Sequence, residues 1–232
     1  MFDLDLIFFK LEEMEMLRVA IDGPGGAGKS TIAKLVAEMF HLDYVDTGAM
    51  YRAVALKVSR SGVSADDDAA IEKIVSRTKL DFDGSSILLD GEDVSSEIRT
   101  PEVSMWASKV SQKACVRELI SKLSSDMANT RSLVMDGRDI GTNVIKDAEV
   151  KVFLTASSIV RAKRRYDQLI EAGKEADLDE IREQIEERDE QDITRELNPL
   201  TQAEDAVYLD TSDMTIDEVV EYIAELINKV ED

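Results

Sequence analysis

Cysteine, histidine and proline are scarce in this chain of 232 residues, which contains one cysteine, one histidine and three prolines. The single cysteine, Cys115, cannot form a disulfide within the chain, so we expect the reducing environment of the cytoplasm. The single histidine, His41, excludes a zinc site built from several histidines and leaves little scope for histidine acid–base chemistry. Aromatic residues make up only 5% of the chain, which together with the few prolines favours a helix-rich α/β protein.

Long apolar runs and an excess of positive charge are also missing. No stretch approaches the roughly 20 apolar residues that crossing a bilayer requires. The formal net charge is −21 at pH 7, with 28 Lys and Arg against 49 Asp and Glu. Such a charge argues against nucleic acid and against an anionic membrane as partners. We expect a monomer, and any site for phosphate esters must gather its arginines locally, because the whole molecule repels anions.

Residues 1–16, MFDLDLIFFKLEEMEM, differ in character from the rest of the chain. A secretory signal has a basic leading region and a longer apolar stretch, whereas this segment begins acidic and has only LIFF in a row. We interpret it as a short N-terminal extension, with Met16 as an alternative first residue. A helix that packs on the edge of the core is the other interpretation.

Residues 23–30, GPGGAGKS, match the phosphate-binding loop pattern G-x-x-x-x-G-K-[ST] at every fixed position. A short apolar run precedes them and a helical spacing of apolar residues follows, which is the strand–loop–helix context that the pattern requires. Glycines let backbone N–H groups approach phosphate oxygens, and a helix N-terminus adds partial positive charge. We expect Lys29 to reach the β- and γ-phosphates and Ser30 to bind Mg²⁺. The predicted triphosphate-binding residues are Gly23, Pro24, Gly25, Gly26, Ala27, Gly28, Lys29, Ser30 and Thr31.

Strands and helices alternate along most of the chain, which predicts an α/β protein with a doubly wound parallel sheet of five strands. The strands are expected at residues 17–22, 43–46, 132–136, 150–155 and 206–210. The helices are expected at residues 31–40, 49–61, 100–127, 159–172, 179–195 and 215–230. Ser157 or Ser158 caps the fourth of these helices, and Gly173 ends it. Residues 80–94 instead alternate apolar and polar side chains around two Asp-Gly pairs, which predicts an inserted antiparallel meander.

Three polar clusters follow the expected sheet strands, where an open α/β sheet places its ligand crevice. They are DTGAMYR at 46–52, DGRDIGT at 136–142 and RDEQDITR at 188–195. In the third cluster Arg188, Asp192 and Arg195 share one helical face, because they are spaced at i, i+4 and i+7. A carboxylate between two guanidinium groups would hold them apart and aim them at a phosphate. A solvated ladder of ion pairs is the alternative.

These motifs together resemble the bacterial cytidylate kinases, in which the same elements occur in this order and spacing. The resemblance runs from about Leu17 to the C-terminus and rests on IDGPGGAGKS, DTGAMYR, EDVSSEIRTPEVS, DGRDIGT and ERDEQDITRELNPL. It implies phosphoryl transfer from ATP to CMP or dCMP with Mg²⁺, giving ADP and CDP or dCDP, in pyrimidine nucleotide metabolism. It also implies one kinase domain over 17–232, with its core at 17–74, 114–157 and 198–232. A small insert at about 75–113 would bind the monophosphate, and a helical lid would cover about 158–197.

The resemblance also assigns roles to individual residues. Lys29, Arg138, Arg188 and Arg195 would be catalytic. The residues that would bind CMP are Thr47, Arg52, Ser108, Arg117, Arg138, Asp139, Arg188, Asp192 and Arg195. Asp136 would orient water on Mg²⁺. Asp139 would accept a hydrogen bond from the exocyclic amine of cytosine, a position where uracil presents a carbonyl.

One departure from this pattern and two other functions stay open. Gln191 stands where some relatives have another lid arginine, and Arg161, Arg164 and Arg165 could supply the missing charge. A kinase for another monophosphate such as UMP, or a non-catalytic nucleotide-binding module, would share the phosphate loop. A GTPase-like switch is disfavoured, because the chain has no Asn-Lys-x-Asp stretch to read guanine.

Overall fold

The structure, a computed structural model, describes residues 16–83 and 86–230. The chain divides into two compact units, Met1–Val45 together with Thr130–Asp232, and Asp46–Asn129. The second unit includes the predicted insert at 75–113 and extends beyond it on both sides. The division into core, insert and lid stays a prediction, and the N-terminal extension lies outside the described residues except for Met16.

The first unit is built on a five-stranded sheet in the order β2-β6-β1-β7-β8. β1 pairs in parallel with β6 and β7, and β7 pairs in parallel with β8. The strands are β1 (Arg18–Asp22), β2 (Asp43–Asp46), β6 (Leu133–Gly137), β7 (Val150–Thr155) and β8 (Val207–Asp210). The strands that follow β1 in sequence, β2 and β6, lie on one side of it, and the last two, β7 and β8, lie on the other. The carboxyl end of β1 is therefore the switch point of the strand order, where ligands bind in such folds. The predicted fold class is confirmed.

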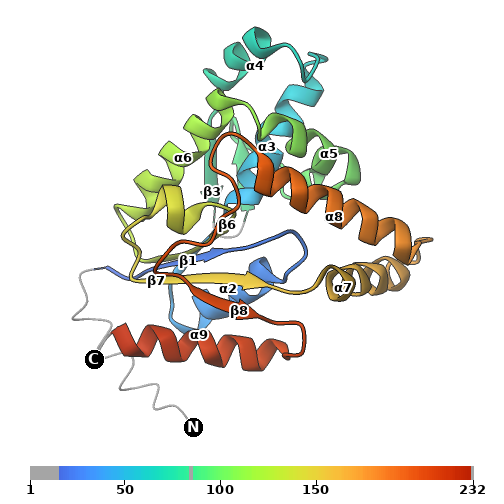
Figure 1. Cartoon of the computed structure of the whole chain (residues 1–232). Helices are drawn as coiled ribbons and strands as arrows, with labels where there is room; N and C mark the ends of the chain where they lie inside the picture. The colour runs from blue at the N-terminus through green and yellow to red at the C-terminus, as the bar shows by residue number, and fades with distance from the viewer. Residues whose placement is uncertain (1–15, 84–85, 231–232) are drawn as a thin grey trace. The chain divides into compact units, whose positions relative to one another are not determined.

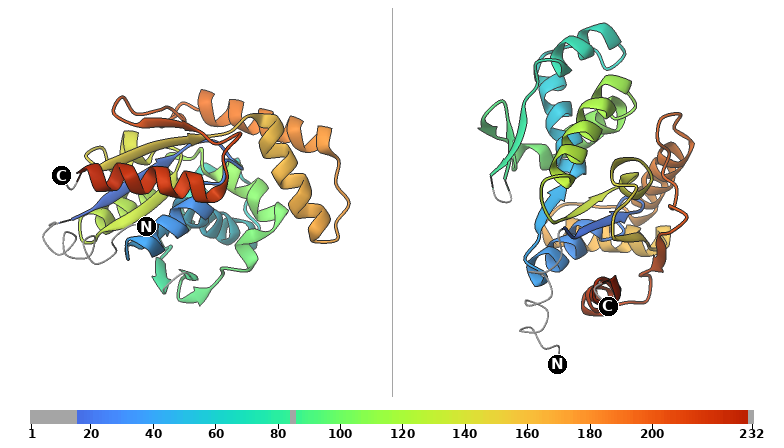
Figure 2. Two further views of the ribbon diagram at one scale, coloured as in Figure 1. Left: turned by 90° about the horizontal axis from the view of Figure 1, so that it is seen from below. Right: turned by 90° about the vertical axis from the view of Figure 1, so that its left-hand side faces the viewer.

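Two helices cover one face of this sheet, α2 (Lys29–Met39) and α9 (Ile216–Val230) (Figures 1 and 2). Val19 and Ile21 point to these helices, since alternate strand residues share a face, and both belong to the main core cluster. Burying each such aliphatic side chain contributes about 1.5–3 kcal/mol. On the opposite face the π-helical turn η2 (Ile140–Val144) lies against β1. The sequence pattern did not predict this turn.

Two charged helices, α7 (Ser158–Glu171) and α8 (Leu178–Thr194), follow β7 and lie side by side (Figure 1). Ser157 caps α7 by accepting a hydrogen bond from the N–H of Val160, which decides between the two serines proposed for this role. Gly173 follows the helix end with a φ of 71°, a left-handed conformation that suits glycine. Both helices agree with the predicted ranges within a few residues.

The second unit combines helices with a small antiparallel sheet in the order β3-β4-β5, so the predicted meander is confirmed. Its elements are α3 (Thr47–Arg60), α4 (Asp68–Val75), β3 (Leu80–Asp83), β4 (Ser86–Leu89), β5 (Glu92–Asp93), η1 (Glu97–Arg99), α5 (Pro101–Val110) and α6 (Ala114–Ala128). The single helix predicted at 100–127 is wrong, because the chain breaks between α5 and α6. Side chains of Ser111 and Gln112 donate to the carbonyl of Ser108 there, and such local bonds compete with helix continuation.

The short helix α4 has no counterpart in the prediction. Asp67 caps it by accepting a hydrogen bond from the N–H of Ala70. With eight residues, the helix is too short to show a clear apolar period. Among the helices within residues 16–83 and 86–230, none has the length and apolar character that a membrane span requires.

Candidate active site

The phosphate loop connects the end of β1 to the start of α2, as predicted. Gly23 has a φ of 145°, and a Cβ there would lie 1.9 Å from the carbonyl oxygen of Leu154 on β7. Gly28 has a φ of 97° directly before α2 begins at Lys29. Only glycine fits both positions without strain, so the sequence of the loop follows from its backbone path.

Lys29 is buried in this loop, and its Nζ donates a hydrogen bond to the carbonyl oxygen of Pro24 at 2.8 Å. Burial, followed by the charge of Arg138, lowers the pKa of Lys29 to about 7, against the opposing pull of Asp136 and Asp22. The carboxylates near this ammonium group therefore do not offset the effect of its burial. Phosphate oxygens in the loop would supply further negative charge and stabilise the cation.

The oxygen atoms that suit Mg²⁺ lie together beside the loop. The Oγ of Ser30 donates to Oδ2 of Asp136 at 2.9 Å, and the hydroxyl of Tyr44 donates to Oδ1 of the same carboxylate at 2.8 Å. Hydroxyl and carboxylate oxygens are ligands that Mg²⁺ accepts. No group of three or more Asp, Glu, His or Cys side chains in the described ranges could hold a metal ion. Bound Mg²⁺ would therefore need phosphate oxygens and water to complete its coordination, as it does in many nucleotide sites.

A cluster of partly buried ion pairs joins the turn after β6 to the end of α8. The Nε of Arg138 donates to Oδ2 of Asp192 at 2.8 Å, and Nη1 of Arg195 lies 3.6 Å from Oδ1 of Asp192. Burial alone would raise the pKa of Asp192, but the charges of Arg138, Arg188 and Arg195 outweigh it and hold that pKa below its usual value. The expected carboxylate between two guanidinium groups is present. Arg138 and Arg195 lie close to it, and the charge of Arg188 acts on it as well, whereas helical spacing had suggested Arg188 and Arg195 alone.

Two of these arginines also reach the phosphate loop. A Cβ placed on Gly25 would lie 3.4 Å from Nη2 of Arg138 and 3.8 Å from Cδ of Arg188. Burial lowers the pKa of Arg138, but the charge and hydrogen bond of Asp192 reverse this, so the net shift is upward. Arg138 therefore keeps its charge in a half-buried position next to the loop.

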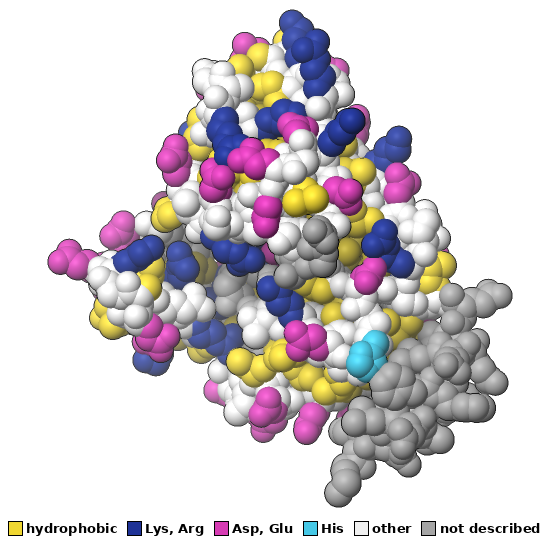
Figure 3. Space-filling view, turned by 180° about the vertical axis from the view of Figure 1, so that it is seen from behind, with side chains coloured by type: hydrophobic (Ala, Val, Ile, Leu, Met, Phe, Trp, Pro, Cys, Tyr) yellow, Lys and Arg dark blue, Asp and Glu magenta, His cyan; other side chains and the backbone are white. Residues whose placement is uncertain are grey.

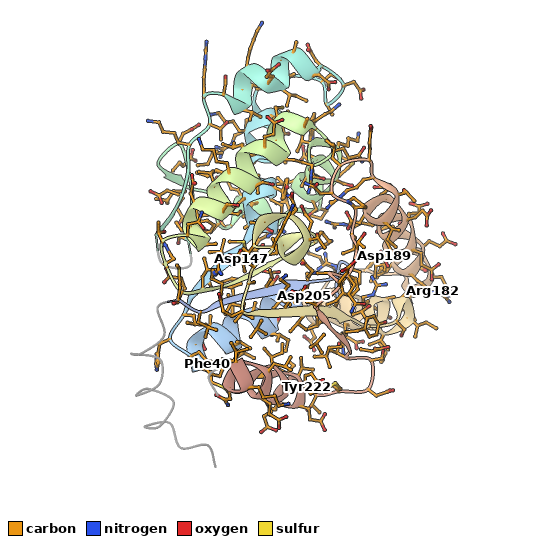
Figure 4. The ribbon with its side chains drawn as sticks, turned by 60° about the vertical axis from the view of Figure 1, so that its left-hand side comes forward. Phe40, Asp147, Arg182, Asp189, Asp205 and Tyr222 are labelled. Carbon is orange, nitrogen blue, oxygen red and sulfur yellow. The ribbon has the colours of Figure 1, made fainter. Side chains whose placement is uncertain are left out.

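Helix α7 is fastened to the phosphate loop by arginines that the sequence suggested as extra lid cations. Nη1 of Arg161 donates to the carbonyl oxygen of Gly25 at 2.9 Å and to Oδ1 of Asp189 at 3.1 Å. Asp189 lies on the side of α8 that faces α7 (Figure 4). Arg164 donates to the carbonyl oxygen of Thr211, after β8, at 2.8 Å. In this conformation the side chain of Arg161 connects α7 to the phosphate loop and to α8, and that of Arg164 connects α7 to the segment after β8.

In the second unit, Arg52 lies at the start of α3. Asp46 caps α3 by accepting from the N–H of Ala49 at 2.8 Å and pairs with Nη2 of Arg52 at 3.0 Å. A Cβ at Gly48 would lie 3.0 Å from the Asp46 carboxylate and 3.1 Å from the Arg52 guanidinium, so this contact needs glycine. Among the described residues, no atom accepts a hydrogen bond from the buried Nε of Arg52. Thr47 is buried as the first residue of α3.

Arg117 is buried on α6, where its guanidinium lies 5.6 Å from the ring centroid of Tyr51. Its Nη1 donates to the carbonyl oxygen of Ser111 at 3.3 Å, one turn beyond Ser108 on α5. The predicted CMP-binding residues thus fall in both units of the chain. Thr47, Arg52, Ser108 and Arg117 belong to the second unit, and Arg138, Asp139, Arg188, Asp192 and Arg195 belong to the first. Their joint action stays a prediction.

The single histidine and the single cysteine do not have the surroundings of reactive groups. His41 is exposed (cyan in Figure 3), and its backbone φ of 52° marks it as the turn after α2. Burial raises the pKa of the half-buried Cys115 thiol, which disfavours the thiolate. Lys and Arg side chains are interspersed with Asp and Glu on the face in Figure 3.

Sequence reasoning missed two residues of the site, Asp22 and Tyr44. Asp22 ends β1 with its carboxylate buried, and it accepts hydrogen bonds from the backbone N–H groups of Ile140 and Gly141. A charged residue at the end of an apolar strand was the available signal, because such a group needs buried partners. Tyr44 gave no comparable signal, since a tyrosine in a strand is common.

Comparisons with known proteins agree with this site. The family model described as cytidylate kinase matches residues 19–229. The cytidylate kinase of Caldanaerobacter subterraneus subsp. tengcongensis is 48% identical over 213 residues, covering 92% of this chain and 95% of the relative. That of Desulforamulus reducens is 49% identical over 214 residues, covering 91% and 96%. A crystal structure of an uncharacterized protein from Eubacterium ventriosum shares the fold, with a TM-score of 0.52 at 13% identity over 92% of this chain and 99% of that one. Loop, arginine cluster and relatives lead to one assignment: this chain belongs to the cytidylate kinase family.

Proposed function

We propose that this chain transfers the γ-phosphoryl group of ATP to CMP or dCMP, giving ADP and CDP or dCDP, in pyrimidine nucleotide metabolism. The observation that carries the proposal is the pair Arg138 and Arg188 beside Gly25 of the phosphate loop. A module that only binds nucleotide has no need of two arginines beside the loop at the point where the transferred group would lie. The relatives named cytidylate kinase support the choice of acceptor. We further propose that the chain works as a cytoplasmic monomer on free nucleotides, without nucleic acid or membrane partners.

The donor half of the reaction would use the loop and its surroundings. The loop amides and Lys29 would bind the β- and γ-phosphates, and Ser30 with Asp136 would hold Mg²⁺, Asp136 through water. Bound Mg²⁺ supplies neutralisation of charge on the phosphates. The protein would contribute alignment of the reacting groups, since phosphoryl transfer requires positioning and electrostatic stabilisation more than covalent chemistry.

The acceptor phosphate would be held by Arg52, Arg138 and Arg195. Guanidinium groups bind phosphate oxygens through paired hydrogen bonds, which fixes the direction of attack on the γ-phosphorus. No general base is required, because the attacking phosphate oxygen is already anionic at neutral pH. The exposed position of His41 is consistent with this.

The cytosine base would be read by Asp139, Ser108 and Arg117. The Oδ1 of Asp139 accepts from Nη2 of Arg195 at 3.1 Å, which holds the carboxylate in place. The carboxylate of Asp139 can accept from the exocyclic amine, and it would repel the carbonyl that uracil presents there. Thr47 would lie close to the acceptor, and Arg188 and Asp192 would contact its ribose.

The test compares CMP, dCMP, UMP and AMP as acceptors, with ADP formation followed in a coupled assay. We expect kcat/KM for CMP or dCMP to exceed that for UMP by about 100-fold or more, because a buried group left facing the wrong base is costly. Comparable turnover of UMP would contradict the cytosine assignment. ATP binding without turnover of any acceptor would favour the non-catalytic module.

Tyr44→Phe tests the arrangement of oxygens beside the loop. The hydroxyl of Tyr44 orients the Asp136 carboxylate, and its loss removes one hydrogen bond to a charged group. We expect the Mg²⁺ concentration that gives half-maximal activity at fixed ATP to rise about 5- to 10-fold. Tyr222→Phe is the matched control, since Tyr222 is partly exposed on α9 (Figure 4). An unchanged Mg²⁺ dependence of Tyr44→Phe would exclude this role for Tyr44.

A further inference from the structure

The carboxylate of Asp22 joins the two loops of the first unit that carry the chemistry. Asp22 is the last residue of β1 and directly precedes Gly23, where the phosphate loop begins. Its side chain is 5% exposed and accepts from the N–H of Ile140 at 2.8 Å and of Gly141 at 2.7 Å. These two N–H groups open η2, the turn that follows directly on Arg138 and Asp139.

The N–H groups at the start of a helical turn have no partner within it and need an acceptor from elsewhere. The residue that precedes the turn normally provides one with its own side chain. In η2 this residue is Asp139, and its side chain makes no capping hydrogen bond. Its carboxylate instead faces Arg195 and Asn143, with Oδ1 of Asp139 3.1 Å from Nη2 of Arg195 and Oδ2 3.3 Å from Nδ2 of Asn143. Asp22, 118 residues away in sequence, therefore does the capping.

We propose that Asp22 is a positioning residue, which caps η2 in place of Asp139 and so holds Arg138 and Asp139 at a fixed place beside the phosphate loop. With η2 capped by Asp22, the Asp139 carboxylate pairs with Arg195 and Asn143 instead of with its own turn. This inference rests on the proposed CMP kinase function and adds a residue to it. The backbone of Asp22 leads into the donor loop while its side chain fixes the acceptor turn, so one residue sets their spacing.

The surroundings of η2 show that the cap is closely fitted. A Cβ on Gly141 would lie 3.2 Å from Cδ of Lys151 on β7, which is a tight contact, and 3.5 Å from Oδ2 of Asp22, which is an ordinary one. The buried Nζ of Lys151 donates to the carbonyl oxygen of Lys146 and to the Asp205 carboxylate, which fixes the far end of the same segment. Burial raises the pKa of Asp22 to about 6, against the lowering effect of the two backbone hydrogen bonds. At neutral pH the carboxylate is ionised, and both oxygens can accept.

Asp22→Asn tests the proposal, because asparagine keeps the shape but offers one accepting oxygen for two N–H groups. We expect the KM for CMP to rise about 10-fold, because one hydrogen bond to a charged group is lost. The KM for ATP should stay within about 2-fold of the wild-type value. Hydrogen exchange of the Ile140 and Gly141 amides, followed by NMR, should accelerate by at least about 10-fold. Val19→Ala on the same strand is the control, since Val19 is fully buried in the apolar core. It should lower the melting temperature and leave the KM for CMP unchanged.

The outcomes separate positioning from stability and from function. Unchanged amide exchange in Asp22→Asn overturns the proposal. It is also overturned if Asp22→Asn raises both KM values equally and lowers the melting temperature as Val19→Ala does. If the wild-type chain does not turn over CMP, the proposed function fails, and faster exchange at Ile140 and Gly141 still supports the cap. Gly141→Ala places a methyl group against Lys151 at the same turn, with ordinary contact to Asp22, and any shift of η2 that it causes should raise the KM for CMP more than the KM for ATP. It provides the test if Asp22→Asn does not fold.

Discussion

Lys29→Met is expected to lower kcat by a factor of about 10³ or more, the largest effect of a single substitution in the donor loop. Methionine fills nearly the same volume, so the change removes the charge and little of the packing. In the structure Lys29 lies buried within the loop, with its ammonium group bonded to the carbonyl oxygen of Pro24, and it is the cation that the loop itself provides for the charge that develops on the transferred group.

The same substitution should leave the fold intact, and the pKa of Lys29 gives the sign of the effect on stability. Burial lowers the folded-state pKa of Lys29 below that of the unfolded chain, so the unfolded state binds more protons between the two values. Stability of the wild type therefore rises with pH through the window from about 7 to about 10.5, and the Lys29→Met chain should lack this contribution. Thermal melting of both chains at pH 7 and pH 9.5 measures the difference.

Lys229→Met is the control for this experiment, since the side chain of Lys229 is exposed near the end of α9. It removes the same charge and should keep the kcat of the wild type. A Lys29→Met chain that is folded and retains more than about a tenth of the wild-type kcat would show that the loop acts without its lysine.

The parts of the molecule that the sequence predicted well are those whose requirements are local. The loop between β1 and α2 needs left-handed or unusual backbone at Gly23 and Gly28, and those glycines are visible in the sequence. The start of α7 at Ser157 and its end at Gly173 also depend on local requirements, a capping hydroxyl and a left-handed backbone conformation, and both residues are visible in the sequence. Buried parallel strands such as β7 show as continuous apolar runs.

The parts that the sequence did not predict depend on contacts between distant segments. Helical spacing placed Asp192 between Arg188 and Arg195, but it contains no information on Arg138, which arrives from the turn after β6. The capping of η2 is a contact between positions 118 residues apart, and no periodicity predicts it. The break between α5 and α6 is a third case, since its polar residues are also compatible with the exposed side of a continuous helix.

Arg138→Ala is expected to reduce kcat/KM for CMP by a factor of about 10² to 10⁴, or roughly 3–5 kcal/mol in the transition state. Arg138 is the residue that connects both halves of the predicted reaction within the first unit. Its Nη2 lies beside Gly25 of the donor loop, and its Nε is held by Asp192. A guanidinium group in this place can bind the transferred group and the attacking phosphate, and a smaller side chain can bind neither.

Survival of the fold in this variant depends on what happens to Asp192, because a buried charge left without a partner destabilises by about 3–5 kcal/mol. Arg195 lies 3.6 Å from the other oxygen of Asp192 and remains in place, so the carboxylate keeps a cation and the chain should fold. Arg138→Lys separates charge from geometry, since lysine keeps the charge without the paired donors. We expect its kcat/KM to fall between those of the wild type and Arg138→Ala.

Arg182→Ala serves as the matched control, because Arg182 is exposed on α8 and pairs with Glu186 on the surface (Figure 4). It should change kcat/KM by less than about 2-fold, as exposed ion pairs contribute little. A rise in the KM for CMP alone in Arg138→Ala, with kcat unchanged, would limit Arg138 to holding the substrate before the reaction. A loss of less than about 10-fold in kcat/KM would exclude it from the transition state altogether, and the transferred phosphoryl group would then have to depend on Lys29, Arg188 and Arg195.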